Sequence, residues 1–168
     1  TANFLFETIP YFYSEENVGF VQTPQCFIDP DIFQYRFYAE NKIPFEQNYF
    51  YNYINIKKNT INTTIFCGTN AVISRKALEK VNYFSTNTLT EDIATGLKIE
   101  AEGFKGIEIN TPLVYGNTVL DFDSFLKQRT RWCRGCIQIL KTTKILTNKK
   151  LTFKQKMDYL SCISYWFF

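Results

Sequence analysis

The sequence predicts an α/β fold in one structural unit. Short segments with strand-like alternation, such as residues 18–22 and 106–109, occur between longer segments with helical spacing. Strands that alternate with helices along the chain are typical of α/β architectures. The chain has 168 residues, which is enough for one hydrophobic core and too few for us to expect two.

The first third of the chain predicts a strand between helical segments. A helix that is already under way at the start of the sequence leads into a turn at residues 14–17, and a strand at residues 18–22 is stopped by Pro24. The aromatic-rich segment at residues 29–59 has helical spacing. It predicts two helices joined near residues 41–44.

The middle of the chain predicts a strand and two helices. Residues 63–73 alternate as a strand, and Ser74 is placed to cap the helix that follows. Thr90 is expected to cap the next helix, which has a stripe of apolar residues on one face. Gly103 stands where a left-handed residue commonly ends a helix.

The last third predicts two short strands and a long amphipathic helix. The strands are expected at residues 106–109 and 113–115, and the helix at residues 121–144. A basic loop then leads to an apolar segment at residues 157–168. A membrane span needs about 20 apolar residues. The pattern therefore permits a span that continues past the end of the sequence, and equally a buried terminal helix.

Charge is unevenly distributed. Residues 124–156 contain ten Lys or Arg and no acidic residue, so the rest of the chain is net acidic. Such a block suggests phosphate-bearing ligands or an anionic membrane surface. The chain has no histidine, which removes the most common general base and metal ligand. Any catalysis is expected to use carboxylates or cysteines.

The cysteines do not predict a disulfide framework. Five of them are scattered along the chain (Cys26, Cys67, Cys133, Cys136 and Cys162), and an odd number suits a reducing, cytosolic environment. Cys133 and Cys136 have CxxC spacing, yet the sequence offers no second pair and no histidine to complete a zinc site. We interpret them as structural thiols.

The segment "QRTRW" combines an amide, two guanidiniums and an indole. On a helix, Gln128, Arg131 and Trp132 share one face, and Arg129 lies about 100° around it. Paired guanidinium donors suit phosphate oxygens, and an indole suits the apolar face of a sugar or base. A nucleotide sugar would use all of them. A solvated basic helix with one Trp facing the core explains the same pattern.

Two further segments carry candidate site residues. In "TED", Asp92 is a candidate general base for a hydroxyl, although acidic residues are favoured in the first turn of any helix. In "FCGTN", Gly68 allows the backbone to approach a ligand closely, although it also suits a simple bulge. "DPD" at residues 29–31 has the spacing of a metal motif, but its central proline favours a turn and a helix cap.

The chain resembles the processive family 2 glycosyltransferases, most closely the bacterial cellulose synthase catalytic subunits. The resemblance lies in five segments that occur in this order: "VQTPQ", "FCGTN", "TEDIATGLKIEAEGFKG", "QRTRW" and "YWFF". The resemblance covers essentially the whole chain. It implies the C-terminal half of a GT-A domain, Rossmann-like with a mixed sheet, at residues 1–120. An amphipathic interface helix with a basic loop would follow at residues 121–150, and the start of a transmembrane helix at residues 151–168.

The resemblance also implies roles for individual residues. Within the motif Thr90, Glu91 and Asp92, the aspartate would deprotonate the acceptor hydroxyl. The donor diphosphate would be held by Gln128, Arg129 and Arg131, and the acceptor sugar by Trp132, Cys67, Gly68 and Thr69. Thr130 falls at a variable position and receives no role.

The activity implied is transfer of glucose from UDP-glucose to the 4-hydroxyl of a growing β-1,4-glucan. The family's Mg²⁺ is bound through a DxD motif that this chain lacks, so the chain alone is expected to be inactive and to provide no metal ligand of its own. Expected partners are the UDP-sugar, the growing glycan, the membrane and an export subunit, with no nucleic acid. The expected location is the cytoplasmic face of the inner (plasma) membrane, with the full-length protein integral to it.

Three alternatives remain open from the sequence. Synthases of chitin, hyaluronan, curdlan and mannan have similar elements and use other sugars or linkages. A catalytically silent glycan-binding subunit would keep the acceptor channel. A basic, aromatic nucleic-acid-binding domain ranks last, because the basic residues cluster in one amphipathic helix.

Overall fold

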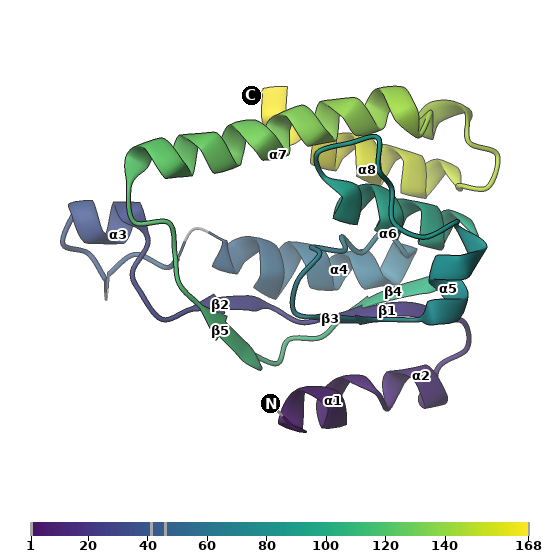
Figure 1. The fold of residues 1–168 in the computed structure, drawn as a ribbon, viewed down its shortest axis with the longest axis horizontal. Coiled ribbons are helices and arrows are strands. Elements are labelled where there is room, and N and C mark those ends of the chain that lie inside the picture. The colour runs from purple at the N-terminus through teal and green to yellow at the C-terminus, as the bar shows by residue number, and fades with distance from the viewer. Residues whose placement is uncertain (1, 41, 46, 168) are drawn as a thin grey trace.

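The computed structural model describes residues 2–40, 42–45 and 47–167, and it has the predicted α/β architecture. Its main sheet is mixed. Strand β1 (Val18–Gln22) lies in the centre, antiparallel to β3 (Ala71–Ile73) and parallel to β4 (Lys105–Glu108). Helices cover both faces of this sheet (Figure 1). The predicted strand at residues 18–22 is confirmed, and the one predicted at 106–109 is displaced by one residue.

A second, two-stranded sheet extends from the first. Strand β2 (Gln25–Phe27) pairs in parallel with β5 (Val114–Gly116). The sequence predicted β5 one residue early and did not predict β2, because Pro24 was interpreted as the end of the strand. Pro24 instead separates two strands that pair with different partners.

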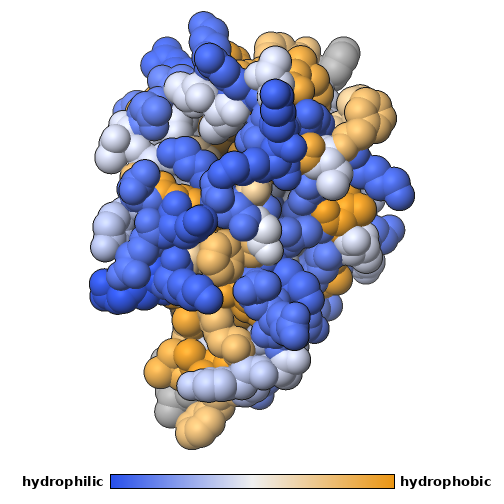
Figure 2. Space-filling view, turned by 90° about the vertical axis from the view of Figure 1, so that its right-hand side faces the viewer, coloured by the Kyte–Doolittle hydropathy of each residue, from blue (hydrophilic) through white to orange (hydrophobic). Residues whose placement is uncertain are grey.

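Helices α1 (Ala2–Thr8) and α2 (Tyr11–Ser14) lie below the main sheet in Figure 1. Tyr11 and Phe12 pack there against a small buried cluster centred on Val21. At the bottom of the view in Figure 2 apolar side chains gather, where Figure 1 places these two helices. The exposed apolar residues of α1 and α2 are Leu5, Phe6 and Tyr13.

Helix α6 (Glu91–Ala101) covers the opposite face of the sheet. Its Ile99 is fully buried against Phe20 of β1. The preceding helix α5 (Arg75–Lys80) is capped as predicted, since the Ser74 hydroxyl accepts a hydrogen bond from a backbone N–H in the first turn. Gly103 has φ +87° just beyond the end of α6, as predicted for a left-handed stop.

Two separate helical segments follow β2, as predicted. The first is α3 (Ile32–Arg36), and Asp31 forms its capping box, so the "DPD" segment is a turn and cap. The second is a continuous helical run made of η1 (Phe50–Asn55, with π geometry), α4 (Ile56–Lys58) and η2 (Asn59–Ile61). Asn41, within the predicted junction, lies outside the described residues.

The strand predicted at residues 63–73 is wrong over most of its length, because only β3 pairs in the sheet. In the segment before β3, side chains instead of a neighbouring strand accept hydrogen bonds from backbone N–H groups. The Ile65 N–H donates to Asn55 Oδ1 at 2.7 Å, and the Cys67 N–H donates to Gln22 Oε1 at 2.9 Å. Gly68, at φ +70°, then turns the chain.

Helix α7 (Phe122–Thr142) lies across the top of α6 and α8 in Figure 1. It is capped by Asp121, whose Oδ1 accepts from the Ser124 N–H at 2.8 Å, and it ends two residues earlier than predicted. The short helix η3 (Ile145–Thr147) follows. The main core lies between these helices, and its buried members include Leu97, Ile139, Ile145, Tyr159 and Ile163.

The segment predicted as the start of a transmembrane helix forms α8 (Phe153–Ser164) and η4 (Tyr165–Phe167), and Phe168 lies outside the described residues. Tyr159 and Ile163 are buried in the main core. Asp158 forms an ion pair with Lys58 of α4. In the part of the chain described, no helix combines the length and apolar character needed to cross a membrane.

Candidate active site

Asp92 lies in the first turn of α6, directly against the turn at Gly68. A Cβ atom added to Gly68 would lie 3.0 Å from Asp92 Oδ2. Gly68 is therefore required for two reasons, since its φ of +70° also disfavours any other residue. The "FCGTN" and "TED" segments, 24 residues apart at these two positions, meet at this carboxylate.

The environment of Asp92 favours a basic carboxylate. Desolvation raises its pKa above the ordinary value, with a smaller contribution in the same direction from Glu91. A hydrogen bond of 2.8 Å from the Ile93 N–H to Asp92 Oδ1 and the positive charge of Arg131 lower the pKa without reversing the shift. A carboxylate with a raised pKa is a better acceptor for the proton of a hydroxyl.

Gln22 at the end of β1 holds the "FCGTN" turn in place. Its amide is fully buried and donates to the Thr69 carbonyl at 2.8 Å, while its Oε1 accepts from the Cys67 N–H. Thr23 Oγ1 donates to the Asn70 carbonyl at 2.9 Å. The "VQTPQ" segment therefore supports the turn that faces Asp92, a role that sequence reasoning did not assign to it.

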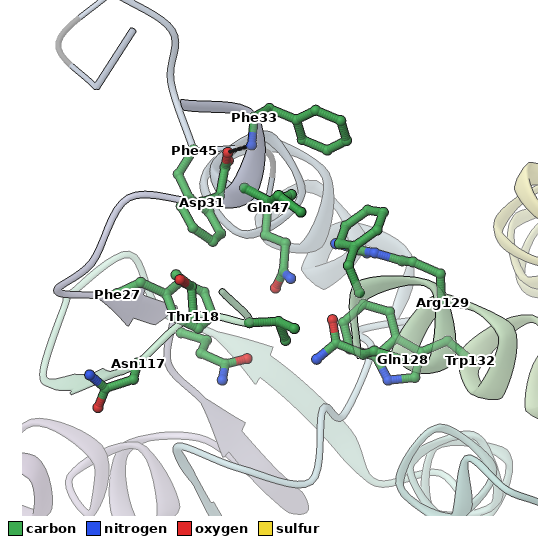
Figure 3. A pocket seen from close by; sticks show the side chains of 14 residues that line it. Phe27, Asp31, Phe33, Phe45, Gln47, Asn117, Thr118, Gln128, Arg129 and Trp132 are labelled. Atoms are coloured by element: carbon green, nitrogen blue, oxygen red, sulfur yellow. Dashed lines mark hydrogen bonds between the residues drawn. The ribbon is translucent and has the colours of Figure 1, made fainter. Parts of the chain in front are cut away.

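Three residues of the "QRTRW" segment line a pocket between α7 and the β2–α3 region (Figure 3). Gln128 and Trp132 lie on one side, facing Phe27, Gln47 and other residues across it. The pocket combines aromatic walls with amide groups. Such a lining suits a ligand with both apolar faces and hydroxyls.

Arg129 also lines this pocket, where helical spacing had placed Arg131 instead. Its guanidinium lies 4.6 Å from the centroid of the Trp132 ring and 4.8 Å from that of Phe125. One face of the indole is therefore covered by a cation. A sugar that stacks on Trp132 would use the other face or displace the guanidinium.

Arg131 lies in a separate, open groove on α7. Lys127, Thr130 and Arg134 share that groove with it, together with apolar side chains. The charge of Arg131 still acts on the Asp92 carboxylate. The side chains of the "QRTRW" segment thus lie in two places, an aromatic pocket and a basic groove.

Thr90 precedes α6 at the capping position, but its side chain makes no capping hydrogen bond. The predicted cap is wrong because the hydroxyl is buried against Thr88 and against Gly135 of α7. The Thr90 side chain therefore contributes to helix packing beside the candidate site.

A second carboxyl is buried near Cys67 of the "FCGTN" turn. Glu108 is 3% exposed and accepts a hydrogen bond of 2.7 Å from Asn55 Nδ2. Burial raises its pKa to about 8, which exceeds the lowering by that hydrogen bond. The thiol of Cys67 lies near this carboxyl, and burial raises the pKa of the thiol as well. Cys67 is therefore neutral and weakly reactive near pH 7, and all five cysteines are free thiols.

The buried Glu108 predicts a local pH dependence. Because its pKa rises from 4.5 to about 8 on folding, the folded state holds a proton that the unfolded state releases between these pH values. Stability supplied by Glu108 is thus complete below pH 4.5 and decreases up to about pH 8. We expect the hydrogen-exchange protection factor of the Ile65 amide, which is bonded to Asn55, to fall from pH 5 to pH 8.5. Glu108→Gln, which stays neutral, should reduce that decrease, and Glu100, whose pKa burial also raises to about 8, supplies the rest of it. An unchanged decrease would contradict the assignment.

The residues that the structure describes do not form a metal site. Within them, no group of three or more carboxylate, thiol or imidazole ligands lies close enough together to hold an ion. Asp92 and Glu91 are adjacent in sequence and stand without a third ligand. The donor set of the described residues therefore does not fit a metal held by them alone.

Comparison with known proteins gives matches over the whole described chain. Residues 3–168 match the family model described as Glycosyl transferase family group 2. The chain is 33% identical over 168 residues to cellulose synthase 1 catalytic subunit (UDP-forming) of Komagataeibacter xylinus, covering all of this chain and 23% of that protein. It is 32% identical over 168 residues to the corresponding subunit of Xanthomonas axonopodis pv. citri, again covering 23%. In cellulose synthase 2 of Novacetimonas hansenii, 33% identity over 168 residues covers 10%. The chain thus spans less than a quarter of the length of these relatives.

Proposed function

Because this chain belongs to glycosyl transferase family group 2, we propose that it forms the acceptor side of an inverting, processive glycosyltransferase of the cellulose synthase type. The proposed reaction transfers glucose from UDP-glucose to the 4-hydroxyl of a growing β-1,4-glucan. One observation carries the proposal above all. The carboxylate of Asp92, with its raised pKa, stands between the Gly68 turn and the α7 helix that contains Arg131.

In the proposed mechanism, Asp92 acts as the general base. It accepts the proton of the acceptor 4-hydroxyl while that oxygen attacks the anomeric carbon of the donor glucose. The bond between this carbon and the diphosphate oxygen breaks, and UDP leaves with the bonding electrons. An α-linked donor becomes a β-linked product by this single displacement, so no covalent enzyme intermediate is needed.

The cationic and polar groups of α7 are assigned to the leaving diphosphate. Gln128, Arg129 and Arg131 would stabilise the negative charge that develops on UDP. Trp132 would stack on the acceptor sugar at the pocket described above. Cys67, Gly68 and Thr69 are not among the residues that line that pocket, and they would line the acceptor site beside Asp92. The neutral state of the Cys67 thiol supports a lining role and not a nucleophilic one.

A divalent metal such as Mg²⁺ is part of the proposed full enzyme. When bound to the donor diphosphate, it would neutralise charge on the leaving group. Since the described residues of this chain do not fit a metal site, the metal would be held by ligands outside them.

The location and partners of the whole protein are also proposals. The cationic block that follows α7 includes Lys149, Lys150, Lys154 and Lys156, and such residues favour the cytoplasmic side of a membrane. We place the enzyme at the cytoplasmic face of the inner membrane, with a UDP-sugar, a growing glycan and an export subunit as partners. No nucleic acid is expected to bind.

Donor selection tests the proposal. Membranes containing the full-length protein are expected to release UDP from UDP-glucose at least about tenfold faster than from UDP-N-acetylglucosamine or UDP-glucuronate, since hydrogen-bonding sites reject poorly matched substituents strongly. The measurement is UDP released per minute from each donor at equal concentration. Preferential use of another donor would favour a chitin or hyaluronan type of synthase, and no release from any donor would favour a silent glycan-binding subunit.

A further inference from the structure

Helix α7 approaches the segment before α6 unusually closely at Gly135. A Cβ atom added to Gly135 would lie 2.5 Å from both Thr90 Cγ2 and Thr90 Oγ1, and 2.8 Å from the Thr90 backbone nitrogen. These distances are far below van der Waals contact, and two of the three atoms belong to a buried side chain. Glycine inside a helix is less favourable than alanine. The close approach to Thr90 explains why a glycine occupies this position of α7.

Two hydrogen bonds join the same elements. Thr88 Oγ1 donates to the carbonyl oxygen of Gly135 at 3.1 Å. The backbone N–H of Leu89 donates to Gln138 Oε1 at 2.8 Å. We call these contacts, made by residues 88–90 with Gly135 and Gln138, the helix–loop clamp. Figure 1 shows the segment before α6 rising to α7 at this place.

The position of the clamp along the chain links the two halves of the candidate site. On one side, Thr90 is followed two residues later by Asp92. On the other side, Gly135 lies four residues after Arg131, which is about one helical turn. A shift of α7 along this contact would therefore change the separation between Asp92 and Arg131 directly.

We propose that the helix–loop clamp is a positioning device, which holds Arg131 within electrostatic reach of Asp92. This role rests on the function proposed above, because it matters only if these two side chains act in one reaction. None of the clamp side chains needs to touch a substrate. They act through α7 and through the first turn of α6.

The charges around Asp92 make this role measurable. In the described part of the chain, Arg131 lowers the pKa of Asp92 and Glu91 raises it. Three neighbouring groups from other elements stay neutral near pH 7, because burial raises their pKa values: Tyr51, Cys67 and Cys136. If α7 moves away, the lowering by Arg131 weakens and the pKa of Asp92 rises further. The acidic limb of the pH–rate profile then moves to higher pH.

The experiment compares Thr88→Val with Thr88→Ser in the full-length protein. Valine keeps the shape of threonine and removes the hydroxyl that bonds to Gly135, whereas serine keeps it. For UDP release, we expect Thr88→Val to lower kcat by about tenfold, as misplacement of reacting groups does. The acidic limb of its kcat/KM profile should lie at higher pH than in the unchanged protein. Thr88→Ser should keep both values within about twofold of those of the unchanged protein.

A second variant keeps the proposal testable if Thr88→Val fails to fold. Gln138→Met retains the length of the side chain and removes the acceptor for the Leu89 N–H. It should shift the acidic limb in the same direction. A lower kcat in both variants without a shift of the acidic limb of the kcat/KM profile would overturn the positioning role. Unchanged kcat and kcat/KM in both variants would overturn it as well. Near-normal turnover of Asp92→Asn would instead overturn the proposed function, so the two failures are distinguishable.

Discussion

Full-length protein that carries Asp92→Asn is expected to bind UDP-glucose and to form roughly 10²- to 10⁴-fold less glucan, the usual effect of removing a general base. The amide keeps the shape of the side chain beside Gly68, so the turn should remain intact. It cannot accept the proton of the acceptor hydroxyl. The measurement is the rate of incorporation of labelled glucose into insoluble polymer, together with the Kd for UDP-glucose.

Asp123 provides the matched control for this substitution. It is the second residue of α7, as Asp92 is of α6, and its side chain is exposed. Asp123→Asn should therefore leave the rate of incorporation within about twofold, as is usual for surface substitutions. Equal losses in the two variants would show that Asp92 matters for the folding of a helix start and not as a base.

Full-length protein with Trp132→Ala is expected to lose elongation by about tenfold, since a lost aromatic contact of about 1.4 kcal/mol corresponds to that factor. The indole lines the pocket that also contains Phe27 and Gln128. Its removal should weaken binding of the glycan end more than binding of the donor. The measurement is the length distribution of the product, with the Kd for UDP-glucose determined in parallel.

Trp132→Phe is the control, because a phenyl ring keeps a smaller stacking surface and a partner for the Arg129 guanidinium, which lies 4.6 Å from the indole centroid. An intermediate product length is expected. Unchanged elongation in Trp132→Ala would assign the indole to packing against Arg129 alone.

Local sequence patterns predicted those structural features that depend on residues close together in the sequence. The strand at Val18–Gln22, the cap at Ser74 and the left-handed stop at Gly103 depend on residues close in sequence, and all three are confirmed. The strand predicted at residues 63–73 fails because Asn55 and Gln22, distant in sequence, bind the backbone N–H groups that a strand would use. The alternation of apolar and polar residues within residues 63–73 contains no information about these distant hydrogen-bond partners.

The candidate site was also predicted in part from local patterns and in part not. The motifs pointed to Asp92 and Gly68, and the fold places them against each other. Helical spacing alone placed Arg131 beside Gln128, whereas the structure places Arg129 there, because the long arginine side chains take opposite sides of α7. The close contact of Gly135 with Thr90 had one visible signal, which is a glycine inside an otherwise regular amphipathic helix.

The most direct test of the proposed function is the linkage of the product. Membranes containing the full-length protein would be incubated with labelled UDP-glucose, and the insoluble product digested separately with an endo-β-1,4-glucanase and an endo-β-1,3-glucanase. We expect label that the β-1,4-specific enzyme solubilises and that the β-1,3-specific enzyme leaves intact. Label that resists the β-1,4-specific enzyme, or label that forms equally well with Asp92→Asn, would contradict it.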